Sequence, residues 1–274
     1  MGGDQVYPVA SQENYHERLI KPYEAALHKS QEPHPHLFAI PGNHDWYDGL
    51  ASFIRLFCQK ESNRRIGGWL LHQTRSYFVL KLPHNWWLVG VDLQLESDID
   101  IPQLNYLSQI AKEMQNGDRI ILCTPTPNWL YSKIYDTSKQ KDSVPCLKTY
   151  DTSKQKDSVL YLEQEVFASH GAQVVLKLSG DFHHYRRHES LSLGSLRKQL
   201  ITAGGGGAFL HPTHGHNVDE LEYGNEKFKQ KAEYPKRKIT CCLTFLNLFF
   251  PIFEPLFRGF NRSSLHNTEL GHAT

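Results

Sequence analysis

Three short segments of this 274-residue chain combine glycine with carboxylate, amide or imidazole side chains. They read GGDQVYP at 2–8, PGNHD at 41–45 and SGDFHHYRRH at 179–188. They contain two carboxylates (Asp4 and Asp181), the amide of Asn43 and the imidazole of His183. Oxygen and imidazole donors of this kind suit a hard or borderline divalent cation. A glycine precedes the first donor of each segment, which permits sharp turns and a close approach of the backbone.

The second and third of these segments follow stretches that predict buried strands, and the first lies at a predicted turn. HLFAI at 36–40 ends at Pro41-Gly42, and AQVVLKLSG at 172–180 ends at Gly180. In an α/β sheet, ligands gather where the carboxyl ends of strands meet the following loops. We therefore expect segments that are far apart in sequence to converge at one edge of a sheet.

Other apolar patterns predict the elements that build this sheet. We expect helices at 13–29 with a kink or restart at Pro22, at 49–59 and at 101–118 with Gly117 as its stop, and strands at 75–82, 86–93 and 119–124. The repeated order of strand, polar loop and helix predicts an α/β fold.

The three polar segments resemble the motifs of the calcineurin-like metallophosphoesterases. GGDQVYP and PGNHD match the second and third blocks of that family, and GDFHH resembles a variant of its last block, G-H-x-H. The resemblance covers about residues 1–215. The stretches NHDWYDGL, GDFHHYRRHE and TAGGGGAFLHPTHG are similar to a bacterial subgroup often joined to membrane segments.

The resemblance implies a four-layer αββα sandwich over residues 1–234, without its first strand and D-x-H block. It also implies a binuclear site for two divalent metal ions, from among manganese, iron, magnesium and zinc. Asp4 would bridge the two ions, Asn43 would bind one and His183 the other. Asp181 takes the place of a family histidine, and a carboxylate there favours manganese, iron or magnesium over zinc.

The reaction implied is hydrolysis of a phosphomonoester or phosphodiester by a metal-activated hydroxide. His44 would act on the leaving group, and Asp45 would hydrogen-bond to His44 and orient it. Contacts to the substrate would come from Arg186, His211 and His214.

The missing D-x-H block leaves other interpretations open. The chain is either part of a longer protein or a degraded copy, and the alternative function is a non-catalytic, membrane-proximal binding module that keeps the fold. A further alternative is a histidine-rich metal-binding protein that uses residues 211–216.

Composition narrows the possible partners. With 30 basic and 29 acidic residues, the chain predicts no dedicated nucleic-acid surface. Five cysteines without C-x-x-C spacing favour a reducing compartment, and the N-terminus does not resemble a signal peptide. We therefore expect a cytoplasmic protein, or one associated with the cytoplasmic side of a membrane.

Two further segments stand out. Within the apolar tail at 235–274, residues 239–257 predict either an interfacial segment in contact with a membrane or a buried packing strip. The sequence YDTSKQKDSV occurs at 135–144 and again at 150–159, and its polar composition predicts an exposed, poorly ordered loop across 135–159.

Overall fold

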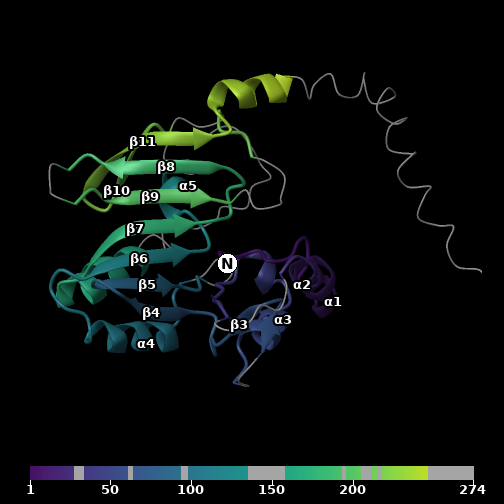
Figure 1. Cartoon of the computed structure of the whole chain (residues 1–274). Coiled ribbons are helices and arrows are strands. Elements are labelled where there is room, and N and C mark those ends of the chain that lie inside the picture. The colour runs from purple at the N-terminus through teal and green to yellow at the C-terminus, as the bar shows by residue number, and fades with distance from the viewer. Residues whose placement is uncertain are drawn as a thin grey trace, which may run out of the picture.

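The computed structural model of the chain describes residues 1–27, 34–60, 64–93, 98–134, 158–192, 196–204, 211–214 and 218–245. The strands form an eight-stranded sheet in the order β10-β11-β8-β9-β7-β6-β5-β4 and a three-stranded sheet in the order β1-β3-β2 (Figure 1). Helices pack against both sheets. The predicted α/β class is confirmed.

The strands of the larger sheet are β4 (Phe78–Leu82), β5 (Trp86–Gly90), β6 (Arg119–Thr124), β7 (Gln173–Ser179), β8 (Tyr185–Ser190), β9 (Gln199–Ala203), β10 (Glu220–Tyr223) and β11 (Glu226–Tyr234). Those of the smaller sheet are β1 (His36–Leu37), β2 (Arg65–Ile66) and β3 (Trp69–Leu71). The α-helices are α1 (Gln12–Tyr15), α2 (Lys21–Ala26), α3 (Ala51–Phe57), α4 (Ile101–Ala111) and α5 (Asn128–Ile134). The π-helical and 3₁₀ turns are η1 (His16–Ile20), η2 (His44–Trp46), η3 (Leu162–Phe167) and η4 (Ala168–His170).

Four adjacent inner strands of the larger sheet are parallel, so their carboxyl ends lie at the same edge of the sheet. Strands β5, β6, β7 and β9 run parallel, and antiparallel strands flank them. The apolar runs of β6 and β7 suit strands covered on both faces, and Ile120, Leu122 and Val175 are buried. All four carboxyl ends therefore lie at one edge, and Figure 1 shows the chain's N-terminal part beside the tips of β5 and β6.

The predicted helices form with adjusted ends. Ser11 caps the first helical run, accepting a hydrogen bond from the backbone of Asn14 at 3.1 Å. A new helix, α2, begins at Lys21 with Pro22 in its first turn, as the proline predicted. Helix α4 ends at Ala111, earlier than predicted, and Gly117 (φ +91°) lies in the turn before β6.

Two apolar clusters explain how the parts hold together. One joins β5, β6 and β7 to α4 and η3, and includes Val89, Leu107 and Phe167. The other joins α1, η1 and α3 to the small sheet through residues such as Phe53 and Leu71.

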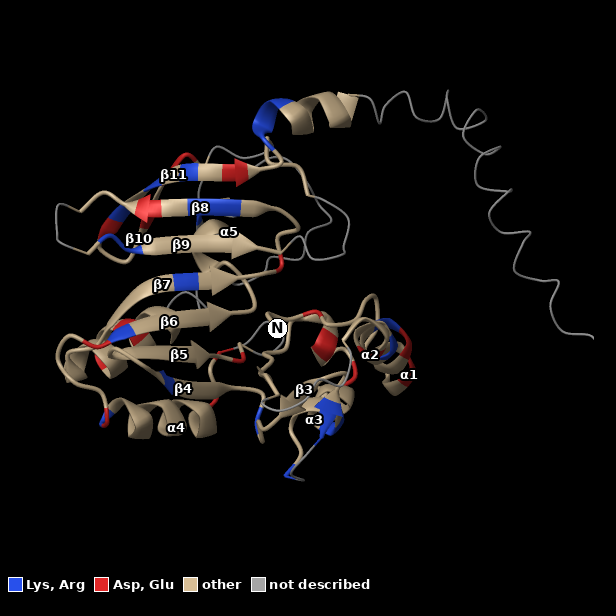
Figure 2. Cartoon of the chain, viewed as in Figure 1, with Lys and Arg blue, Asp and Glu red and all other residues tan. Residues whose placement is uncertain are grey.

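Charged residues of both signs lie along the outer strands β8, β10 and β11 (Figure 2). On the β10–β11 hairpin, exposed ion pairs join Lys227 to Glu222 and Lys229 to Glu220, each at 3.7 Å. Exposed pairs of this kind contribute about 0–1 kcal/mol to stability. The hairpin therefore depends on its buried face, where Leu221 and Phe228 pack.

Two predicted segments lie largely outside the described residues. Of the duplicated loop, 135–157 is not described, whereas Val159, the last residue of the second copy, is buried in the core. Of the apolar tail, residues up to 245 are described, and Ile239, Leu243 and Phe245 are exposed. None of the helices in the described part of the chain is both long and apolar enough to cross a membrane.

Strand β8 carries a buried polar face that includes Arg186 and His188. The Nε2 atom of His188 lies 2.8 Å from the carbonyl oxygen of Val218, and burial lowers the pKa of this imidazole to about 4. The unfolded chain binds the proton near pH 6.5. The stabilising effect of neutral His188 is therefore fully present above that pH and is lost as the pH falls toward 4.

We predict that His188→Gln flattens the pH dependence of stability between pH 6.5 and 4. Glutamine keeps a donor for Val218 but does not titrate, so the slope should fall by about 1.4 kcal/mol per pH unit at most. Urea unfolding at several pH values measures this slope. Substitution of the exposed His16 by Gln is the control, and an unchanged slope in His188→Gln would contradict the assignment.

Candidate functional site

The three sequence segments meet around one small cavity at the carboxyl edge of the large sheet. Asp4, Asn43 and Asp181 line it, together with Gly2, Gly3, Gly42, Pro125 and Thr126. Its volume is about 10 Å³, close to the space that one water molecule needs. The predicted convergence of Asp4, Asn43 and Asp181 is thus observed, and the cavity has room for about one small ion.

The backbone around this cavity adopts conformations that few residues tolerate. Asp4 (φ +51°) and Asp181 (φ +64°) both lie in the left-handed region, where aspartate is more common than most residues. A Cβ on Gly42 would lie 2.3 Å from the Oδ1 atom of Asp4. Only glycine at position 42 therefore allows the first loop to approach this closely.

The two cavity carboxylates are partly withdrawn from water. Burial raises the pKa of Asp4, although a hydrogen bond from the backbone of His44 at 2.9 Å opposes that rise. Burial also raises the pKa of Asp181, where the hydroxyl of Tyr131 opposes the rise and the charge of Asp4 adds to it. Two buried carboxylates that interact unfavourably attract a cation between them.

The buried carboxylate of Asp45 links the loops that form the site. It is fully buried, and its Oδ2 atom accepts hydrogen bonds from the backbone of Asp4 and of Gly42, both at 2.8 Å. Its other oxygen accepts from the hydroxyl of Tyr15. Burial raises the pKa of Asp45 to about 6. The predicted hydrogen bond between Asp45 and His44 is wrong, because the carboxylate accepts from the backbone of Asp4 and Gly42 and from the Tyr15 hydroxyl instead.

A backbone carbonyl orients His44 instead. The Nδ1 atom of His44 lies 2.7 Å from the carbonyl oxygen of Pro8, and the imidazole lies between the rings of Tyr7 and Tyr47, at 4.6 and 4.7 Å. A carbonyl can only accept, so Nδ1 must carry a proton. The tautomer is therefore set by Pro8, and Nε2 is the atom left to exchange a proton with a ligand.

Two of the histidines predicted near the site, His183 and His211, lie against each other. The ring of His183 stacks on that of His211 at 4.4 Å and 11°, and the backbone of His211 donates to the carbonyl of His183 at 3.0 Å. Burial raises the pKa of Asp4 and of Asp181, and the proximity of His183 opposes this rise, although His183 does not line the cavity.

His214 and Arg186 are not part of this cluster. Among the described residues, His214 has no hydrogen bond or ring contact with the residues around the cavity. The prediction that Arg186 contacts substrate is wrong in this structure, because its side chain is only 3 % exposed. Its guanidinium donates to the carbonyl of Thr213 at 2.5 Å and lies 3.9 Å from Glu233, so it serves to hold strands together.

The sequence reasoning missed several residues around the site. Pro125 and Thr126 follow β6, and the rule that loops at carboxyl strand ends form sites could have included them. The hydrogen-bonding roles of Tyr15, Tyr131 and Pro8 have no sequence signal, since each depends on a contact between distant segments. The Cys123 thiol, at the end of β6, does not line the cavity, and burial raises its pKa to about 11.

A ready-made group of three or more His, Cys, Asp or Glu metal ligands is not found in the described ranges. The cavity instead offers two carboxylates and one amide, with the amide nitrogen of Asn43 3.4 Å from the hydroxyl of Tyr47. These oxygen donors fit a hard divalent cation. Comparisons with protein-family models, with curated proteins and with solved structures gave no match.

We predict that Asp45→Ala lowers the free energy of unfolding much more than Asp45→Asn does. Alanine leaves two backbone N–H groups and the Tyr15 hydroxyl without their acceptor, so the free energy of unfolding should fall by about 3 kcal/mol or more. Asparagine keeps an acceptor oxygen for the backbone groups and can donate to Tyr15, so its loss should be about 1 kcal/mol. Urea unfolding measures both, and an alanine variant as stable as wild type would contradict this role.

Proposed function

We propose that this protein is a metal-dependent phosphoesterase that hydrolyses a phosphomonoester or phosphodiester. The observation that carries the proposal is the convergence of Asp4, Asn43 and Asp181 on one cavity from segments up to 177 positions apart in the sequence. The left-handed backbone of both aspartates supports it, because strained conformations concentrate at functional sites.

In this proposal, Asp4, Asn43, Asp181 and His183 would together hold two divalent ions, one of them in the small cavity that Asp4, Asn43 and Asp181 line. Bound divalent metal supplies Lewis-acid polarisation of the phosphoryl group and hydroxide at neutral pH. The carboxylate and amide oxygens favour manganese, iron or magnesium over zinc. At the level of architecture, we propose that the two sheets and their helices belong to the four-layer αββα arrangement of the calcineurin-like family.

His44 serves as the proton donor to the leaving oxygen. Its Nδ1 atom donates to the carbonyl of Pro8, which leaves Nε2 as the ring atom that can face the leaving oxygen. Its backbone N–H donates to Asp4, so the leaving-group residue and the proposed bridging ligand are held at a fixed separation. Tyr7 and Tyr47 restrict the ring from both sides.

We predict that Asn43→Ala abolishes manganese-dependent turnover of 4-nitrophenyl phosphate or its diester. The loss should be about 100-fold or more, since even outer-shell partners of a metal contribute roughly 10–100-fold. Asn105→Ala, at an exposed position of α4, is the matched control and should leave turnover unchanged.

A second readout separates binding from catalysis. Manganese should raise the melting temperature of wild type and of Asn105→Ala, but not of Asn43→Ala. Absence of turnover in wild type, or full turnover in Asn43→Ala, would overturn the proposal. A manganese-induced rise without turnover would instead favour the non-catalytic binding module.

We predict that the effect of His44→Ala depends on the leaving group. An alkyl phosphate needs its leaving oxygen protonated, so its hydrolysis should slow by about 10²–10⁴-fold. A 4-nitrophenyl ester leaves readily without protonation and should slow much less. Comparison of the two substrates measures this difference, and equal losses would show that His44 does not donate the proton.

A further inference from the structure

A second, larger cavity lies at the opposite edge of the eight-stranded sheet. It has a volume of about 210 Å³ and is lined by the first residues of β7 and β9, by η3 and by the turn between β10 and β11. Because β7 and β9 are parallel, their first residues and Asp181 lie at opposite edges. This cavity is therefore separate from the phosphoesterase site.

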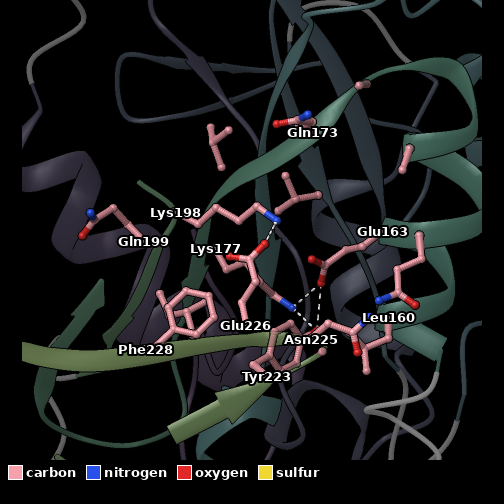
Figure 3. A pocket seen from close by; sticks show the side chains of 17 residues that line it. Leu160, Glu163, Gln173, Lys177, Lys198, Gln199, Tyr223, Asn225, Glu226 and Phe228 are labelled. Atoms are coloured by element: carbon pink, nitrogen blue, oxygen red, sulfur yellow. Dashed lines mark hydrogen bonds and ion pairs between the residues drawn. The ribbon is translucent and has the colours of Figure 1, made fainter. Parts of the chain in front are cut away.

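A fixed charged network forms one wall of this cavity (Figure 3). The ammonium of Lys177 lies 2.6 Å from the Oε1 atom of Glu163 and bonds to the hydroxyl of Tyr223, which donates to Glu163 at 2.8 Å. The Lys177 side chain is 2 % exposed and lies 4.0 Å from the ring of Tyr223. These three groups satisfy one another and make a rigid wall.

The second ion pair of the cavity retains free bonding capacity. The ammonium of Lys198 bonds to the Oε1 atom of Glu226, and Figure 3 shows this pair facing the Lys177–Glu163 network. The Oε2 atom of Glu226 is buried and has no hydrogen-bond partner. An ammonium carries three protons, and within the described structure that of Lys198 donates to Glu226. An oxygen that can accept a further hydrogen bond therefore lies beside an ammonium that can donate one.

Charge and shape define the occupant. Two lysines and two glutamates make the wall neutral, so it disfavours a ligand with a large net charge of either sign. Leu160, Leu200 and Phe228 add apolar surface. The volume is below the roughly 300–1,000 Å³ of sites for drug-sized ligands, which suits a molecule about the size of an amino acid.

We propose that this cavity binds a small zwitterion, an α-amino acid with an apolar side chain. A rotation of the Glu226 carboxylate brings its buried Oε2 atom into the cavity, where it accepts from the ligand's ammonium. The ligand's carboxylate accepts from Lys198, and its side chain lies against Leu200 and Phe228. The charges of ligand and wall then alternate. The site requires no metal and is independent of the phosphoesterase proposal.

Calorimetric titration of the full chain, without added metal, tests the proposal with three probes. Leucine carries both charges, 3-methylbutylamine only the ammonium, and 4-methylpentanoate only the carboxylate. Leucine should bind and raise the melting temperature, and each single-charge probe should bind about tenfold more weakly or worse, since each loses a hydrogen bond to a charged group. Equal binding of leucine and either single-charge probe, or no binding of leucine at millimolar concentration, would overturn the proposal.

Two variants locate the binding. Glu226→Gln and Lys198→Met should each weaken leucine binding by about tenfold. Glu222→Gln and Lys227→Met alter the exposed ion pair of the same hairpin, outside the cavity, and should leave leucine binding unchanged. Wild-type affinity in both Glu226→Gln and Lys198→Met would show that leucine binds elsewhere and would contradict the assignment. Melting curves of all four variants confirm that they are folded before titration.

Discussion

Three donors from three separate segments meet at the buried carboxylate of Asp45. Two are backbone N–H groups, from Asp4 in the first loop and from Gly42 in the PGNHD loop, and the third is the Tyr15 hydroxyl on α1. A buried carboxylate is costly unless such donors compensate it. Because this single carboxylate accepts from all three donors, it fixes two loops and one helix relative to each other. The positions of Asp4 and Asn43 at the cavity follow from that arrangement.

Close backbone approach is the second condition for the site. The position where a Cβ on Gly3 would sit lies 2.9 Å from the backbone of Gly42. With no side chains between them, the two loops bring Asp4 and Asn43 to the same cavity. Asp181 arrives from the end of β7, where Tyr131 on α5 bonds to its carboxylate. Asp4 and Asp181 are therefore each held by a partner from another segment, namely the backbone of His44 and the hydroxyl of Tyr131.

The interior on the β7–β11 side of the sheet is unusually polar. Lys177 is buried against Glu163, and Arg186 is buried against Thr213 and near Glu233. Such groups specify which strands pair, because a shifted register would leave a buried charge without its partner. The Lys177–Glu163 pair also forms a wall of the second cavity, so it contributes both to the packing there and to the electrostatic character of the cavity.

The chain's local patterns determined most of the fold's parts. Apolar runs indicated β6 and β7 and the alternation of strands with helices, and the glycine-polar motifs identified Asp4, Asn43 and Asp181 as neighbours. These predictions succeeded because strand and helix periodicity, and the position of loops at strand ends, are local properties of sequence.

Only the tertiary structure decided how the polar side chains are used. Asp45 supports the loops while Pro8 orients His44, and Arg186 is buried although the sequence analysis predicts that it contacts substrate. These outcomes depend on which distant atoms come within hydrogen-bonding reach. A hydrogen bond requires a separation of about 3 Å, and no spacing along the chain specifies such a distance between segments that meet only after folding.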